Sequence, residues 1–183
     1  MSIITSPKPY AYEFFTGTWR IEFGGHGCFL ITGTKNAMLI DTGMNRNNLR
    51  EFVESITDLP IIVVNTHGHF DHTGGNGWFD KVYMSEYASG EAKKAFPHIE
   101  HPEDFPFDYE IVVIEEGHIF DIGGRRIEAI ASPAHSPGSF CYLDKDRRLL
   151  FTGDEFESGQ MRCLLQERRL RGRRHLRSSS SIT

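Results

Sequence analysis

The sequence is short of cysteine and of long apolar runs, and each shortage excludes a class of protein. Three cysteines stand among 183 residues, and so sparse and odd a set provides no disulfide framework. The apolar runs are short, as at Ile61–Val64, whereas a membrane helix needs roughly 20 apolar residues. The first residues also lack the basic start and apolar core of a signal peptide. We therefore expect a protein of the cytoplasm with no membrane partner.

Positive charge is scarce over most of the chain and is concentrated at one end. The whole sequence has 20 basic and 25 acidic residues, a net charge of −5, which argues against a protein built around nucleic-acid binding. Residues 160–183 hold seven arginines against one glutamate, or +6, which leaves 13 basic and 24 acidic residues, or −11, in residues 1–159. The two parts of the chain therefore have opposite charge.

The basic segment also lacks aromatic residues, because all 22 of them precede residue 160. Such a segment buries too little apolar surface to offset the entropy lost on ordering. We expect residues 1–159 to form one domain and residues 160–183 to be a disordered Arg/Ser-rich tail. Nucleic-acid binding by this tail is a weak alternative, since no aromatic side chains are interleaved for base stacking.

Strand and helix patterns alternate along residues 19–151, which predicts an α/β layered domain. A helix is expected after Asn47 or Asn48, because apolar residues recur at helical spacing up to Leu59, before Pro60. A second helix is expected over 86–96, capped by Ser85, followed by an irregular loop over 97–108. Strands are expected at 19–23, 28–32, 37–40, 61–64, 82–84, 111–114, 127–131, 140–143 and 149–151.

The strongest chemical signal is the sequence Thr-His-Gly-His-Phe-Asp-His at 66–72, directly after the apolar strand 61–64. His67, His69 and Asp71 are two residues apart, so an extended segment would project them to one side and His72 elsewhere. Imidazole and carboxylate are ligands that zinc, iron and manganese accept. The motif therefore predicts a metal site in which one tight loop supplies two adjacent ions.

Further candidate ligands follow other predicted strands. His135 lies in the loop 132–139 between two strands, and Asp154 lies just past the strand 149–151. Metal sites are commonly assembled from such loops on a rigid sheet. Asp41, which ends the strand 37–40, is expected to support the ligands rather than to bind metal.

The other histidines are expected to stay outside the metal site. His26 stands between glycines in a turn, His98 and His101 fall in the loop 97–108, and His118 is expected at a strand edge. His175 lies in the Arg-rich segment, which offers neither a positioned loop nor supporting residues.

Taken in order, Asp41-Thr42-Gly43, His67-x-His69-x-Asp71-His72, His135 and Gly153-Asp154 resemble the pattern of the metallo-β-lactamase-fold hydrolases, over about residues 17 to 159. The resemblance implies an αβ/βα sandwich with the metals at one edge of its two sheets. It also implies that three histidines, His67, His69 and His135, bind the first ion. Asp71 and His72 would bind the second ion, and Asp154 would bridge the two.

The chemistry of such a centre is hydrolytic. A metal ion lowers the pKa of bound water, so that hydroxide exists near neutral pH, and it polarises a carbonyl. Asp71 is the candidate catalytic residue, which orients the hydroxide and passes a proton to the leaving group. We expect a hydrolase of a small-molecule ester, thioester, lactone or amide, with one or two Zn²⁺ ions and with iron or manganese as alternatives.

The sequence departs from the family pattern after Asp154. The family has one more ligand histidine there, with further strands and a helix, whereas this sequence offers only His175. We therefore expect the second half of the sandwich to be incomplete, through truncation after the Asp154 motif or loss of the reading frame near Gln160. A non-catalytic or weakly active fragment that binds a single metal is thus the main alternative, and exposed strand edges could make it a homodimer.

Overall fold

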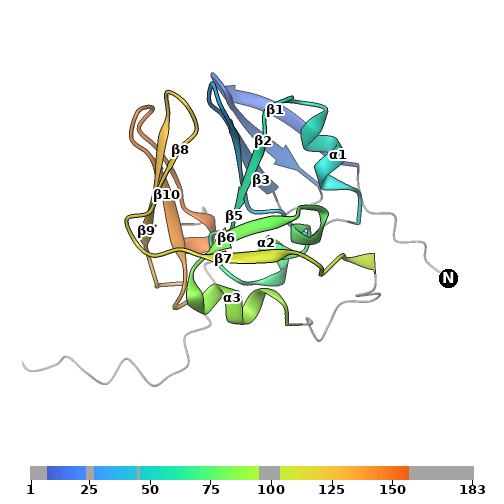
Figure 1. The fold of residues 1–183 in the computed structure, drawn as a ribbon, viewed down its shortest axis with the longest axis vertical. Helices are drawn as coiled ribbons and strands as arrows, with labels where there is room; N and C mark the ends of the chain where they lie inside the picture. Colours follow the sequence, from blue (N-terminus) through green and yellow to red (C-terminus); the bar gives the residue numbers. More distant parts are fainter. Residues whose placement is uncertain (1–7, 24–26, 45, 95–103, 157–183) are drawn as a thin grey trace, which may run out of the picture.

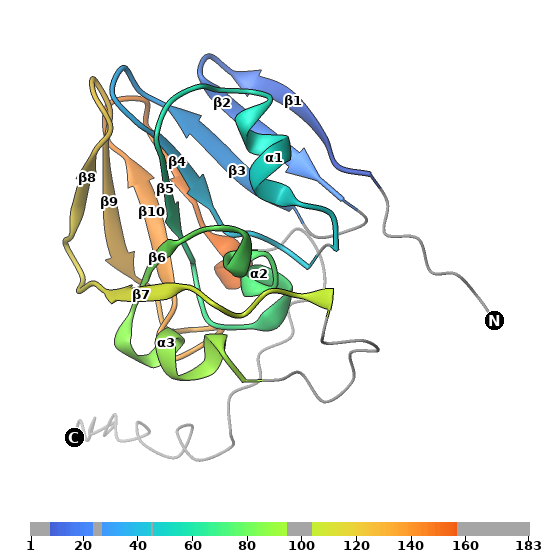
Figure 2. The ribbon, with the colours of Figure 1, turned by 45° about the vertical axis from the view of Figure 1, so that its right-hand side comes forward.

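Two β-sheets pack face to face, with three short helices beside the larger sheet (Figures 1 and 2). The computed structural model describes residues 8–23, 27–44, 46–94 and 104–156. The first sheet has the order β1-β2-β3-β4-β5-β6-β7 and the second β11-β10-β9-β8. The strands are β1 (Tyr10–Phe15), β2 (Thr18–Glu22), β3 (Gly27–Thr32), β4 (Ala37–Ile40), β5 (Ile61–Val64), β6 (Lys81–Met84), β7 (Glu110–Val113), β8 (Ile119–Asp121), β9 (Arg126–Ala131), β10 (Phe140–Asp144) and β11 (Leu149–Phe151).

The helical segments are short. They are α1 (Leu49–Glu54), α2 (Phe70–Thr73) and α3 (Glu86–Ala92), with the 3₁₀ turns η1 (Asn76–Trp78) and η3 (Gly153–Glu155). No helix among the described residues is long and apolar enough to cross a membrane. The expected α/β fold with two sheets is confirmed. The expected incompleteness of its second half concerns residues after 156, which lie outside the described part of the chain.

The change from antiparallel to parallel pairing in the first sheet creates the edge that carries the site. Strands β1 to β4 pair antiparallel, whereas β4, β5, β6 and β7 pair parallel. In this register Ile40 lies opposite Val64, so β4 and β5 end side by side. The chain segments that begin at Asp41 and at Asn65 therefore leave the sheet at the same edge.

The middle of the first sheet is buried on both faces, which explains the continuous apolar runs in β4 and β5. Leu39 and Val63 face α1 and α3, while Met38, Ile40 and Val64 face the second sheet. The second sheet contributes its own buried side chains to the core between the sheets, chiefly Ile127, Ala129, Tyr142 and Phe151.

A buried ion pair fixes the second sheet to the β1–β2 hairpin of the first. Arg125 lies just before β9 and is 3% exposed, and its Nη2 is 2.6 Å from an Asp144 carboxylate oxygen. The same guanidinium donates to the Gly17 carbonyl oxygen at 2.6 Å and to Thr18 Oγ1 at 2.8 Å. One side chain thus joins β10 to the β1–β2 hairpin across the sandwich.

Several elements differ from the sequence-based expectation. The first helix ends at Glu54, although Leu59 still packs against the helix-side core as its spacing suggested. The strand β1 and the helix α2 were not expected, and neither was β8, where only His118 had been placed at a strand edge. The helix expected over 86–96 ends earlier, at Ala92 with Lys93 as its C-cap, and most of the loop 97–108 lies outside the described residues.

Candidate metal centre

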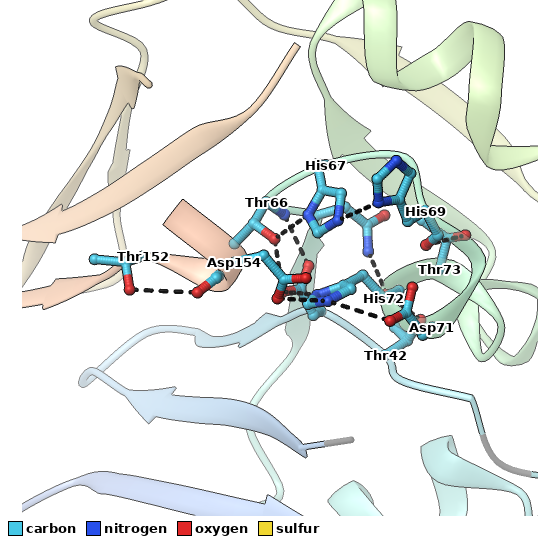
Figure 3. A network of polar contacts seen from close by, with 12 residues as sticks. Thr42, Thr66, His67, His69, Asp71, His72, Thr73, Thr152 and Asp154 are labelled. Atoms are coloured by element: carbon cyan, nitrogen blue, oxygen red, sulfur yellow. Dashed lines mark hydrogen bonds and ion pairs between the residues drawn. The ribbon is translucent and has the colours of Figure 1, made fainter. Parts of the chain in front are cut away.

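The predicted ligands come together from three separate segments at the edge where β4 and β5 end. Figure 3 shows those of the motif 66–72 together with Asp154. His67 lies in the turn after β5, His69 is the residue that precedes α2, and His72 lies on α2. His135 comes from the loop between β9 and β10, and Asp154 from the turn η3 after β11. Loops from both sheets therefore supply one cluster.

Three imidazole nitrogens face one another in the first ligand group. His69 Nδ1 lies 3.0 Å from His67 Nε2 and 3.1 Å from His135 Nε2. Nitrogens bound to one tetrahedral zinc ion at its usual bond length are roughly 3.3 Å apart. The donor set and its spacing therefore fit a single ion held by His67, His69 and His135, all within 4.8 Å of one another.

A second group consists of His67, His72 and Asp154. His72 Nε2 lies 3.0 Å from Asp154 Oδ1, and the rings of His67 and His72 are 4.2 Å apart between centroids. The other Asp154 oxygen lies 3.5 Å from His135 Nε2. The Asp154 carboxylate therefore stands between the two groups, with one oxygen toward each.

The local geometry of the motif differs from the expected extended segment. A helix begins at Phe70, so Asp71 does not follow His67 and His69 on one side, and its carboxylate lies outside both groups. Asp71 Oδ2 is 3.9 Å from His72 Nε2, and its side chain is 35% exposed. The expectation that His72 faces elsewhere is wrong, because the helical turn brings its ring against His67. A ligand or catalytic role for Asp71 stays a prediction.

Asp41 supports the motif through contacts with Thr66 and His72. Its two carboxylate oxygens accept hydrogen bonds from the Thr66 amide at 2.7 Å and the Thr66 hydroxyl at 2.8 Å, and one lies 2.9 Å from His72 Nδ1. The residue is buried and has a φ of 62°, in the left-handed region. Such strain persists only where surrounding contacts enforce it. These contacts agree with the supporting role expected for Asp41.

Burial and neighbouring charges shift the pKa values of the clustered histidines in opposite directions. Burial, helped by His72, lowers the pKa of His67 to about 3, and burial with His135 lowers the pKa of His69. Burial also opposes the charged form of His72, but Asp41 and Asp154 outweigh it and raise the pKa of His72 well above its usual value. His67 and His69 are therefore neutral imidazoles, the form that binds metal.

Without bound metal, the protein should lose stability as the pH falls from 6.5 to about 4. In this range the unfolded chain protonates His67 and His69, whereas the folded state keeps their pKa values below 6.5 and stays neutral there. Near pH 6.5 His72 opposes this trend, because it is fully protonated only in the folded state; at lower pH it is protonated in both states and adds no slope. Urea unfolding in the presence of a chelator measures the trend. The variant His67→Gln should show a shallower decline, and a flat wild-type profile would contradict the assignment.

Gly153 allows the Asp154 segment to approach Thr66 closely. Its φ is 52°, and a Cβ atom there would lie 2.5 to 3.0 Å from the Thr66 side chain. Gly117 has a similar positive φ, but a Cβ atom there would meet nothing within 4 Å.

The variant Gly153→Ala should therefore lose about 1–3 kcal/mol more stability than Gly117→Ala, because it adds overpacking to the same backbone strain. Chemical unfolding of both variants measures the difference. Equal losses of stability in the two variants would show that the Thr66 side chain moves aside without an energetic cost.

Sequence analysis missed the buried polar residues behind the cluster. Thr42 Oγ1 donates to Asn76 Oδ1 at 2.8 Å, Asn76 donates to Asn65 Oδ1 at 2.9 Å, and Asn65 donates to the His72 carbonyl at 2.9 Å. All three side chains are buried. The one available signal was the position of Asn65, a polar residue directly after an apolar strand.

The remaining histidines do not join the two groups in the described structure. The His118 ring lies next to Phe120 beside β8, as a strand-edge residue. His26, His98, His101 and His175 lie outside the described residues, as does the tail 160–183.

Comparison with known proteins places this arrangement in a family. A model of the metallo-beta-lactamase superfamily matches residues 21–167. The human acyl-coenzyme A thioesterase MBLAC2 is 28% identical, with 73% of this chain and 59% of that protein covered. The atrochrysone carboxyl ACP thioesterase AacuM of Aspergillus aculeatus is 31% identical, with 74% of this chain and 41% of that protein covered. The chain thus spans less than two thirds of the length of these relatives.

Solved structures show the same fold. A metallo-beta-lactamase from Cronobacter sakazakii matches with a TM-score of 0.62 at 22% identity, covering 78% of this chain and 61% of that one. The subclass B3 metallo-beta-lactamase BJP-1 of Bradyrhizobium japonicum matches with a TM-score of 0.60 at 23% identity, covering 80% of this chain and 61% of that one. Since the family model spans most of the sequence and the two-sheet architecture agrees with it, the chain belongs to the metallo-beta-lactamase superfamily.

Proposed function

We propose that this protein is a metal-dependent hydrolase of small-molecule thioesters. The observation that carries the proposal is the convergence of three imidazole nitrogens, His67 Nε2, His69 Nδ1 and His135 Nε2, at ligand spacing. The choice of thioester over ester, lactone or amide is supported by two relatives that are named as acyl-coenzyme A and ACP thioesterases. Imidazole and carboxylate donors accept zinc, with iron and manganese as alternatives.

The residues divide into ligands and a proton carrier. His67, His69 and His135 would hold a first ion, and His72 with Asp154 would hold a second. A divalent ion supplies a Lewis acid for the carbonyl oxygen and lowers the pKa of a coordinated water. A cavity of about 530 Å³ lies against Asp71, His72 and Asp154, and it can admit the scissile group.

Asp71 is placed to move the proton. Its side chain is partly exposed beside His72 at the cavity, so it can reach both water and substrate. Water attacks the carbonyl carbon, and Asp71 accepts the proton that is released. When the carbon–sulfur bond breaks, the thiolate takes that proton, and the products are a carboxylic acid and a thiol.

Metal analysis together with a hydrolysis assay tests the proposal. Wild-type protein should contain metal and cleave generic thioesters, and His69→Ala should lose both properties because it removes a nitrogen from the first group. The matched control His118→Ala removes a histidine outside both groups and should change neither. A wild-type protein without metal, or turnover that survives His69→Ala, would refute the proposal.

A single-metal, weakly active or non-catalytic protein is the second candidate. It is favoured by the unequal ligand groups, because the first has three histidines whereas the second shares His67 and adds His72 and Asp154. One metal per chain that His72→Ala leaves in place, with no turnover, would support this candidate. Two metals per chain with turnover would exclude it.

A further inference from the structure

The residue after Asp154 is a buried acid that receives an unusual set of hydrogen bonds. Glu155 is 4% exposed. One of its oxygens accepts from the His135 amide at 3.0 Å, and the other accepts from the Ala134 amide and the Ser132 hydroxyl, both at 3.2 Å. Three donors of one short loop therefore converge on a single carboxylate.

The carboxylate depends on this loop for its stabilisation. Across the described ranges, no Lys, Arg or His side chain forms an ion pair with Glu155. Burying a carboxylate costs free energy unless its charge is paired or hydrogen-bonded, so the three hydrogen bonds from the loop stabilise the buried charge of Glu155. The loop and the acid therefore hold each other in one conformation.

Within the described structure, the His135 ring lacks a hydrogen bond at Nδ1 that would fix its orientation. Its Nδ1 is buried and lacks a hydrogen-bond partner among the described residues. Metal-binding histidines usually donate this second nitrogen to a supporting group, which fixes the ring orientation. For His135 the corresponding restraint acts on the backbone amide, through Glu155.

The same acid is joined covalently to the other ligand segment. Glu155 and Asp154 are neighbours in η3, and the His135 amide lies 20 positions away in the sequence. The hydrogen bond to Glu155 thus ties the segment that carries His135 to the segment that carries Asp154. In the structure, the His135 and Asp154 side chains approach to 3.5 Å.

We propose that Glu155 is a positioning residue that sets the place of His135 relative to Asp154 and thereby the metal affinity of the centre. The inference rests on the proposed function, because it requires that the centre binds metal. Glu155 itself belongs to neither ligand group and affects metal binding through its hydrogen bonds with the loop 132–135.

Zinc affinity by chelator competition and the absorption spectrum of the cobalt-loaded protein test this role. Glu155→Ala should weaken zinc binding by roughly 10- to 100-fold and alter the cobalt spectrum, because a misplaced His135 changes the ligand field. Glu155→Gln keeps one accepting oxygen and should restore part of the affinity. The control Glu128→Gln, on the β9 strand that leads into the loop, should match the wild type.

The outcomes separate this inference from the proposed function. If Glu155→Ala folds and keeps wild-type zinc affinity and cobalt spectrum, the positioning role is wrong and the metal centre stands, even if the variant melts earlier. If the wild type binds no zinc or cobalt, the proposed function fails first. Should Glu155→Ala not fold, Glu155→Gln decides, and an affinity equal to that of the control overturns the inference.

Discussion

Replacing Asp144 by alanine should lower the free energy of unfolding by about 3–5 kcal/mol, because it leaves the buried Arg125 guanidinium without its counter-ion. The two side chains are 4% and 0% exposed, so water cannot take over the lost interaction without opening the sandwich. Arg125 would keep its bonds to Gly17 and Thr18, but neutral oxygens do not balance its charge.

Urea unfolding of the purified variants measures this effect. Asp146→Ala is the matched control, since it removes an acid that pairs with Arg126 at the surface, and it should leave the midpoint essentially unchanged. The double variant Arg125→Met with Asp144→Leu should recover part of the loss, because it removes both buried charges together. A single variant as stable as the control would show that the pair contributes nothing.

Asp41→Asn should weaken metal binding by roughly 10- to 100-fold, the usual cost of losing a group that supports a ligand. Asparagine tolerates the positive φ at this position, so the backbone is kept. Its amide nitrogen cannot accept hydrogen bonds. The variant therefore loses either the bond from the Thr66 amide or the acceptor that the Thr66 hydroxyl shares with His72. His72 also loses one of the two charges that raise its pKa.

Titration with zinc against a chromophoric chelator provides the measurement for Asp41→Asn. Asp80→Asn removes an acid whose side chain is 89% exposed and pairs with Arg50, outside both ligand groups, and the variant should bind zinc as the wild type does. Equal affinity in both variants would mean that Thr66 and His72 are positioned without Asp41.

The segments of the cluster could be predicted from the sequence because its candidate ligands follow predicted strands. Each candidate was expected in a loop that follows a predicted strand, and because β4 and β5 run parallel, the residues after them, including Asp41 and His67, leave the sheet at one edge. The approach of His135 and Asp154 to them follows from the same rule applied to the second sheet. Strand ends together with the resemblance to the family pattern therefore indicated the segments that meet.

The details that sequence reasoning missed depend on tertiary contacts. No side-chain cap announces α2, since His69 makes no capping bond, so the motif was expected to be extended. Strand β1 is mostly exposed and lacks the alternation of buried and exposed residues on which strand prediction relies. Glu155 looks like an ordinary surface acid until the loop from the neighbouring strands is folded over it.

The Arg125 side chain also has a consequence for how the chain is made. Its bonds to Gly17 and Thr18 join residues 108 and 107 positions apart, and its counter-ion comes 19 residues later still. During synthesis the β1–β2 hairpin leaves the ribosome before Arg125 and Asp144, so this ion-paired contact cannot form until both have been added. A hairpin that is made early is thus held in its final place by a residue made 108 positions later.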